Sequence, residues 1–213
     1  TPTATVYAAP STNTLYSVQG NDGMCNTNTL SRNVYAYSNG TWNGSKNTSW
    51  TDAGNWCGGV PTSSTAIIIP STAPNQPAIA SGAQQGASIT FNNSTSLSVA
   101  AGASLTVGNA IFKPTTATLS GTGKLNVTNI LTVQDGSTLT TGGVVVLKSD
   151  ASKTARLAPV GAGIISGNVT VERYIPAKAS RYWSLLSSPV TQSLQNSWQQ
   201  QIHITGAGTG GTI

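Results

Sequence analysis

Charged residues are scarce in this chain, and their scarcity excludes one class of partner. They make up 7% of the 213 residues, against about a quarter in ordinary globular domains. The formal net charge of +5 arises because there are only 5 acids to set against 10 Lys and Arg residues, which are scattered along the sequence. No run of basic residues alternates with aromatic side chains, as grooves that bind nucleic acids require. We therefore expect no nucleic-acid partner.

The few acids also leave little for catalysis. Asp150 and Glu172, twenty-two positions apart, are the pair best placed to meet on successive turns of a repeat. They would then resemble the two carboxylates of a polysaccharide-cleaving enzyme. Structural use as turn caps, by Asp150 in Ser149-Asp150-Ala151 and by Asp135 in Gln134-Asp135-Gly136, is the stronger interpretation. The single histidine, His203, is flanked by no Ser or Asp motif, and no nucleophile elbow or phosphate-binding loop occurs. The sequence predicts no enzyme activity and no cofactor.

Long apolar runs are missing, and cysteine is rare. No stretch of eighteen apolar residues occurs, so we expect no membrane-spanning helix. There is no signal peptide and both ends look cut, which we interpret as a piece of a longer polypeptide. Cys25 and Cys57 permit one disulfide, which suits an oxidising compartment, although each could instead pair elsewhere or stay reduced. Two cysteines and one distant histidine cannot supply four metal ligands, so no metal site is predicted.

The most informative feature that is present is a repeat of twenty residues. Small residues open each repeat, and an aliphatic residue follows at the same position in the ladder Leu105, Leu125, Val145 and Ile165. A second ladder keeps the same spacing, through Ile111, Leu131, Ala151 and Val171. Repeats of this kind are typical of solenoids, in which each coil buries its apolar face against its neighbours.

The repeat predicts a fold. Each coil divides into three short strand segments separated by Gly, Ser, Thr or Asn turns. This pattern predicts an all-β chain with a short right-handed parallel β-helix of about 20-residue coils. A β-sandwich is the alternative, and the constant spacing disfavours it because sandwich strands vary in length.

The sequence on either side of the repeat differs from it and defines the expected domains. Residues 1–38 alternate as strands do and resemble the closing strands of an immunoglobulin-like domain of bacterial surface proteins, which implies a partial immunoglobulin-like β segment there. We predict a cap containing tryptophan and cysteine at 39–80, the parallel β-helix at 81–175, and a C-terminal cap and linker at 176–213. Within the first cap, Trp42, Trp50 and Trp56 have two interpretations. They predict a plug that covers the open end of the solenoid, or alternatively an aromatic platform on which sugars stack.

Several motifs resemble a known group of proteins. Residues 42–61, which end in Asn55-Trp56-Cys57-Gly58-Gly59-Val60-Pro61, and residues 181–189 are similar to a pattern common in large secreted surface proteins of Bacteroidetes. With further matches at 147–150 and 167–174, the similarity covers most of residues 40–206. It implies export by the type IX secretion route and a β-helical segment between immunoglobulin-like modules. It implies no catalytic residues. In such modules Cys25 would pair with a cysteine further upstream.

We therefore predict a noncatalytic extracellular structural or adhesive module of a bacterial cell-surface protein, such as a stalk, an adhesin, or a filament or surface-layer subunit. The expected partners are other copies of the chain, neighbouring modules of the same polypeptide, and glycans. One alternative is a carbohydrate-binding module that uses the tryptophan cluster. A less favoured alternative is a polysaccharide-degrading β-helix enzyme that uses Asp150 and Glu172.

Overall fold

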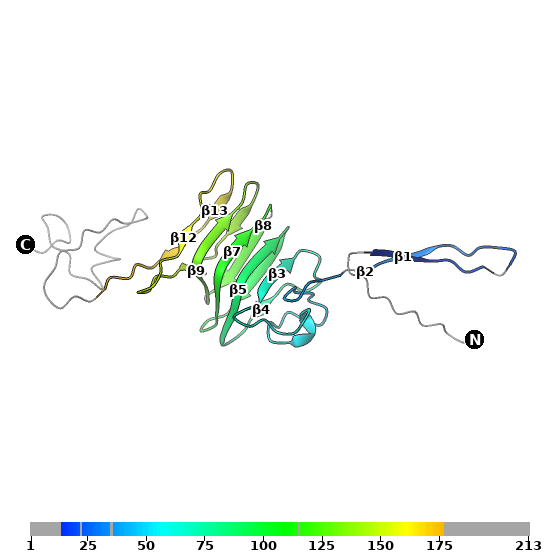
Figure 1. The fold of residues 1–213 in the computed structure, drawn as a ribbon, viewed down its shortest axis with the longest axis horizontal. Helices are drawn as coiled ribbons and strands as arrows, with labels where there is room; N and C mark the ends of the chain where they lie inside the picture. The colour runs from blue at the N-terminus through cyan, green and yellow to red at the C-terminus, as the bar shows by residue number, and fades with distance from the viewer. Residues whose placement is uncertain (1–13, 22, 35, 115, 177–213) are drawn as a thin grey trace, which may run out of the picture. The chain divides into compact units, whose positions relative to one another are not determined.

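The computed structural model describes residues 14–176, except 22, 35 and 115, and these residues form an all-β structure (Figure 1). In this part of the chain the only helical element is a three-residue 3-10 turn, η1 (Ala53–Asn55). No helix among these residues is long and apolar enough to cross a membrane. The prediction of an all-β fold is confirmed.

Two parallel sheets wind together into a β-solenoid of about five turns, as the repeat predicted. Parallel strands cannot be joined by a tight hairpin, so the chain passes from one sheet to the other and back on each turn. The larger sheet contains β3 (Ala66–Pro70), β5 (Ala83–Asn92), β7 (Ser104–Phe112), β9 (Lys124–Val133), β11 (Val145–Leu147), β12 (Arg156–Leu157) and β14 (Thr170–Val171). The smaller contains β4 (Ala78–Ile79), β6 (Thr95–Val99), β8 (Thr116–Gly121), β10 (Thr138–Thr140) and β13 (Ile164–Ser166).

The inner ladder of aliphatic residues forms the core of the larger sheet. Leu105 lies opposite Leu125, and Leu125 lies opposite Val145, in neighbouring parallel strands. All three side chains are fully buried. Aromatic residues stack in the same way, because Phe91 and Phe112 lie opposite each other with ring centroids 4.6 Å apart. Each coil therefore buries its side chains against the next, as expected for a solenoid.

The prediction that Ile165 is the fourth residue of this ladder is wrong. Ile165 lies on β13 in the smaller sheet, opposite Leu139 rather than Val145, and it is only half-buried. The residues that continue the larger sheet after β11 are those of β14. The physical reason is an excursion of the chain after β11, through a bridge between Ser149 and Thr154 and the short strand β12. This insertion lengthens the coil, so a constant period of twenty residues does not hold along the chain.

The long strands of the larger sheet each supply two of the three predicted segments. In β7 the buried residues are Leu105 and Val107 before Gly108, and Ala110 and Phe112 after it. The alternation of inward-facing and outward-facing side chains along β7 therefore changes phase at Gly108, and the pairing register between β7 and β9 shifts at the same place. A β-bulge of this kind re-aims the side chains that follow it. The sheet also divides here, since β11 pairs with the first half of β9 and β12 with the second half.

The N-terminal region contains one described hairpin, β1 (Thr14–Val18) and β2 (Leu30–Val34), which pair antiparallel. An immunoglobulin-like fold is therefore not confirmed by the described residues. The register puts Val18 opposite Leu30 on one face and Ser17 opposite Ser31 on the other, and both Val18 and Leu30 are exposed.

The chain divides into one unit of residues 1–174 and a second of residues 175–213. Of the second unit, the structure describes only Ile175 and Pro176. The predicted C-terminal cap and linker at 176–213, and His203 within it, therefore lie almost entirely outside the described residues.

Candidate functional site

The tryptophan cluster was the strongest candidate for a binding site, and its three side chains are buried. The exposed fractions of Trp42, Trp50 and Trp56 are 0%, 1% and 4%. Trp56 lies edge-on to both other rings, with centroid distances of 4.9 Å to Trp42 and 4.7 Å to Trp50. A sugar-stacking platform needs solvent-facing rings, so the carbohydrate-binding interpretation of this cluster is wrong. The geometry is that of a packed aromatic plug.

Hydrogen bonds attach this plug to the first coil of the solenoid. The backbone N–H of Trp42 donates to the carbonyl of Ile68 in β3, and that of Trp50 donates to Ala78 in β4. The Trp42 indole Nε1 donates to the carbonyl of Asn75 at 2.6 Å. The cap thus pairs with the first strand of each sheet, where a bare edge would otherwise expose unpaired backbone groups.

A buried asparagine holds the loop of the cap together. Asn55 is fully buried, and its Oδ1 accepts from the backbone N–H groups of Lys46 and Asn47. Its Nδ2 donates to Asn47 Oδ1 and to the carbonyl of Ser49. All the hydrogen-bonding capacity of the amide is used, as a buried polar group requires. The sequence pattern did not single out this residue, and its only signal is its position just before Trp56.

Asp52 begins η1 and stabilises the same loop. Its Oδ1 accepts from the backbone N–H of Gly54 at 2.9 Å, and its Oδ2 accepts from Asn47 Nδ2 at 3.1 Å. The Gly54 hydrogen bond, followed by that from Asn47, lowers the pKa of the Asp52 carboxyl. The carboxylate is therefore a capping group of the loop.

The two carboxylates considered for catalysis make separate structural contacts. Asp150 accepts from the side chain and the backbone N–H of Ser152, and from the N–H of Lys153, and these hydrogen bonds lower its pKa. Glu172 pairs with the Lys148 ammonium group and also accepts from the N–H of Ser149. A glycosidase pairs one carboxyl group of raised pKa with a second that stays ionised, and the lowered pKa of Asp150 does not suit the first of these roles. The Asp150 contacts, all within its own turn, support the turn-capping interpretation of that residue.

Of the alternatives left open for the cysteines, a Cys25–Cys57 disulfide is not formed in the structure. Cys25 is exposed in the connection between β1 and β2, whereas Cys57 is half-buried in the cap. The backbone of Cys57 is held by hydrogen bonds to Gly40 and Thr41. The two cysteines therefore lie in different parts of the structure, one in the β1–β2 connection and one in the cap.

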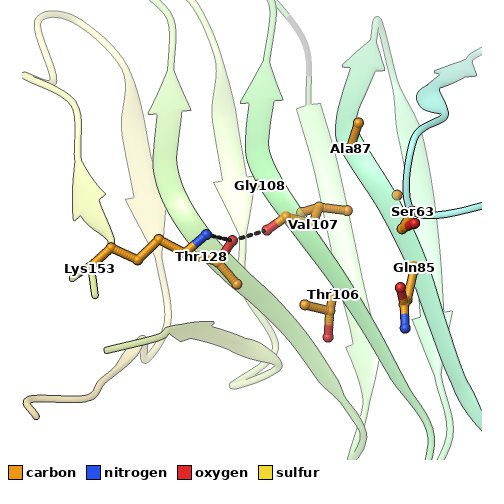
Figure 2. Close-up of a pocket in the computed structure, with 9 residues that line it drawn as sticks. Ser63, Gln85, Ala87, Thr106, Val107, Gly108, Thr128 and Lys153 are labelled. Carbon is orange, nitrogen blue, oxygen red and sulfur yellow. Dashed lines mark hydrogen bonds between the residues drawn. The ribbon is translucent and has the colours of Figure 1, made fainter. Parts of the chain in front are cut away.

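A shallow groove on the outer face was not foreseen from the sequence (Figure 2). It is an open hollow of about 320 Å³. Its polar lining residues are Ser63, Gln85, Thr106, Thr128 and Lys153, and the rest of its lining is Gly86, Ala87, Val107 and Gly108. It crosses the strands at the shift in register near Gly108. A Cβ at Gly108 would lie 2.7 Å from the carbonyl oxygen of Ala87, so this point of the face bears no side chain. These residues come from separate coils, so no local sequence pattern marks them.

Among the described residues, no group of three or more His, Cys, Asp or Glu side chains gathers to hold a metal ion.

Residues 41–122, which span the cap and the coils up to β8, match a family described as a domain of unknown function (DUF8693). No curated protein and no solved structure matches the chain.

Proposed function

We propose that this chain is a noncatalytic structural module of an extracellular surface protein, in which the solenoid acts as a rigid spacer. The observation that carries the proposal is a single continuous core that runs from the tryptophan cap through the ladder to Val145 and Leu147. Because each coil is held by its neighbours on both sides, such a core resists bending and local opening. A spacer needs this property.

The composition of the outer surface favours an extracellular position. Only 7% of the residues are charged, and the exposed side chains of the described strands include the amide of Gln85 and the hydroxyls of Thr116 and Thr118. The similarity of residues 42–61 to secreted surface proteins of Bacteroidetes supports export by the type IX route. In the same proposal the β1–β2 hairpin belongs to an immunoglobulin-like module that precedes the spacer.

The two ends of the solenoid differ in their capacity to bind another copy. At the β3–β4 end, the cap occupies backbone groups of Ile68 and Ala78. At the β13 end, Ile164 and Leu157 are 56% and 42% exposed. A filament or surface-layer contact between copies would therefore use the β13 end rather than the capped one.

A replacement experiment tests the spacer role. In the full-length protein that contains this chain, residues 39–175 are exchanged for an unrelated β-solenoid of equal length. We expect antibody labelling of intact cells and cell attachment to be retained, because a spacer contributes length rather than recognition. Loss of attachment with normal surface display would refute the spacer role. Labelling that requires permeabilised cells would refute the extracellular position.

A further inference from the structure

The last coil of the solenoid, residues 148–174, contributes little to the buried core. It contains the excursion after β11 together with β12, β13 and β14, and its only buried side chain is that of Ala155. Ile165 and Val171 pack against the core but are only half-buried, and Leu157 is 42% exposed. By contrast, β9 in the middle of the solenoid buries four side chains. Segments with few buried apolar contacts open at the lowest cost in free energy, so we expect this coil to be the least stable of the solenoid.

The backbone of the last coil is also held by short ladders. The strands β7 and β9 pair along eight residues, whereas β12, β13 and β14 pair with earlier strands along two, three and two. In the part of the chain that the structure describes, no further strand lies beyond these three, so each of them is paired on one side only. The last coil is therefore attached to the solenoid by a small number of backbone hydrogen bonds.

Side-chain contacts add only surface interactions to these ladders. The Lys148 ammonium group pairs with Glu172, and the two side chains are 39% and 36% exposed. The backbone N–H of Tyr174 donates to Ser149 Oγ at 2.9 Å, at an exposed position. Exposed ion pairs contribute little to stability, because water and salt screen their attraction. These contacts fix the position of the last coil without anchoring it strongly.

The opposite end of the solenoid is held more firmly. The side chains of Trp42 and Trp50 are buried there, and their backbone N–H groups donate to carbonyls of β3 and β4. Opening this end would expose the tryptophan cluster to water, and large aromatic side chains dominate the energetics of a buried core. The two ends therefore differ in their cost of opening, which is lower for the last coil.

The direction of the hydrogen bonds determines how tension acts on the two ends. Hydrogen bonds between neighbouring strands point from one coil to the next, so a pull along the solenoid axis loads the terminal coils first. We propose that residues 148–174 form a releasable coil, which detaches under tension while the cap and the coils up to Leu147 stay folded. This inference rests on the proposed spacer function, because a spacer between a cell and its attachment site carries tension. Release lengthens the chain by about 90–100 Å, since about 27 residues extend by about 3.3–3.6 Å each.

Stretching of single molecules with optical tweezers tests this inference. The chain of 213 residues is held by its two termini, and it carries Cys25→Ser so that this exposed thiol does not compete with the engineered bridges. We expect the first unfolding step of the solenoid to lengthen the chain by about 90–100 Å. This step should occur at a lower force than the unfolding of the remaining coils.

An engineered disulfide identifies the step. Thr140 and Ser166 lie opposite each other in β10 and β13, and the distance between neighbouring strands suits a disulfide. In the protein with Thr140→Cys and Ser166→Cys, oxidation should shorten the step to less than about 30 Å, because only about eight residues beyond the bridge can detach. Reduction should restore the full step. Val146→Cys with Thr170→Cys, opposite each other in β11 and β14, is the second bridge where the first prevents folding.

A bridge within the β1–β2 hairpin is the matched control. Ser17 and Ser31 lie opposite each other, are both exposed, and have hydroxyl oxygens 2.8 Å apart. Ser17→Cys with Ser31→Cys should alter only the opening of the hairpin and leave the step of the last coil unchanged.

The inference is overturned if the whole solenoid unfolds in one step. It is also overturned if the first step of the solenoid is the same with the bridge between positions 140 and 166 oxidised or reduced. Neither result affects surface display or cell attachment in the replacement experiment, so failure of this inference is distinguishable from failure of the spacer proposal.

Discussion

Removal of the central ring of the cap, by Trp56→Ala, is the most direct test of the plug. Trp56 is 4% exposed and packs edge-on against two other tryptophans. Truncation of a buried tryptophan costs about 3–5 kcal/mol. The change also removes the 2.6 Å hydrogen bond from Trp56 Nε1 to the carbonyl of Trp50, which adds about 1 kcal/mol. We therefore expect the free energy of unfolding to fall by about 4–6 kcal/mol, a large share of the roughly 5–15 kcal/mol typical of a domain.

The measurement is urea unfolding followed by circular dichroism, together with amide hydrogen exchange. Because a solenoid is stabilised coil by coil, protection should be lost first in β3 and β4, which bond directly to the cap, and last in β7 and β9. Leu157→Ala is the control, since Leu157 is 42% exposed and its truncation should cost about 1 kcal/mol or less. A Trp56→Ala protein within about 1 kcal/mol of the parent would refute the plug. So would loss of protection that begins in the middle coils.

Three further predictions concern local contacts. Gly44→Ala should destabilise the fold by about 1–3 kcal/mol more than Gly136→Ala. Both glycines have positive φ, but only at Gly44 would an added Cβ collide with a carbonyl oxygen, that of Asn75. Equal denaturation midpoints for the two variants would contradict this prediction. The pKa of Asp52 is lowered in the folded state, so its contribution to stability is present above the ordinary pKa of 3.8 and is lost as the pH falls through the folded-state pKa. The Asp52→Asn protein should therefore lose less thermal stability than the parent when the pH is lowered through this range. An unchanged acid profile of the melting temperature would remove Asp52 from that role. Lys148→Met should change the free energy of unfolding by only about 0–1 kcal/mol in low salt, because the side chains of Lys148 and Glu172 are 39% and 36% exposed. A larger loss of stability that persists in high salt would contradict the assignment of this pair as a surface ion pair.

The ladder shows how far spacing alone predicts a fold. Leu105, Leu125 and Val145 were placed correctly because the coils between them have equal length. The second predicted ladder paired Ile111 with Leu131, whereas Ile111 lies opposite Thr132 and Ala110 lies opposite Leu131. The register shift after Val107 moves this half of the sheet by one residue. A bulge is a local backbone event, so a period counted from side chains misses it.

The candidate sites show a second limit of prediction from sequence. Three tryptophans within fifteen residues are equally consistent with a plug and with a binding platform, because composition does not report exposure. The outer groove was missed for the opposite reason. Its residues come from separate coils and are unremarkable in the sequence, so only the winding of the chain brings Gln85, Thr106 and Lys153 to one face.

The sequence was sufficient to predict the all-β class and to favour a parallel solenoid over a sandwich, since stacked coils bury an aliphatic position that recurs at a constant spacing. The tertiary structure alone decided the rest: that the tryptophans face inward, that Ile165 belongs to the smaller sheet, that Cys25 and Cys57 do not bridge, and that polar side chains line an outer groove. The physical reason is that burial and pairing depend on where bulges and insertions place each coil against its neighbour. The pairing register between neighbouring coils is set by backbone hydrogen bonds between residues about twenty or more positions apart. A local sequence pattern does not predict this register.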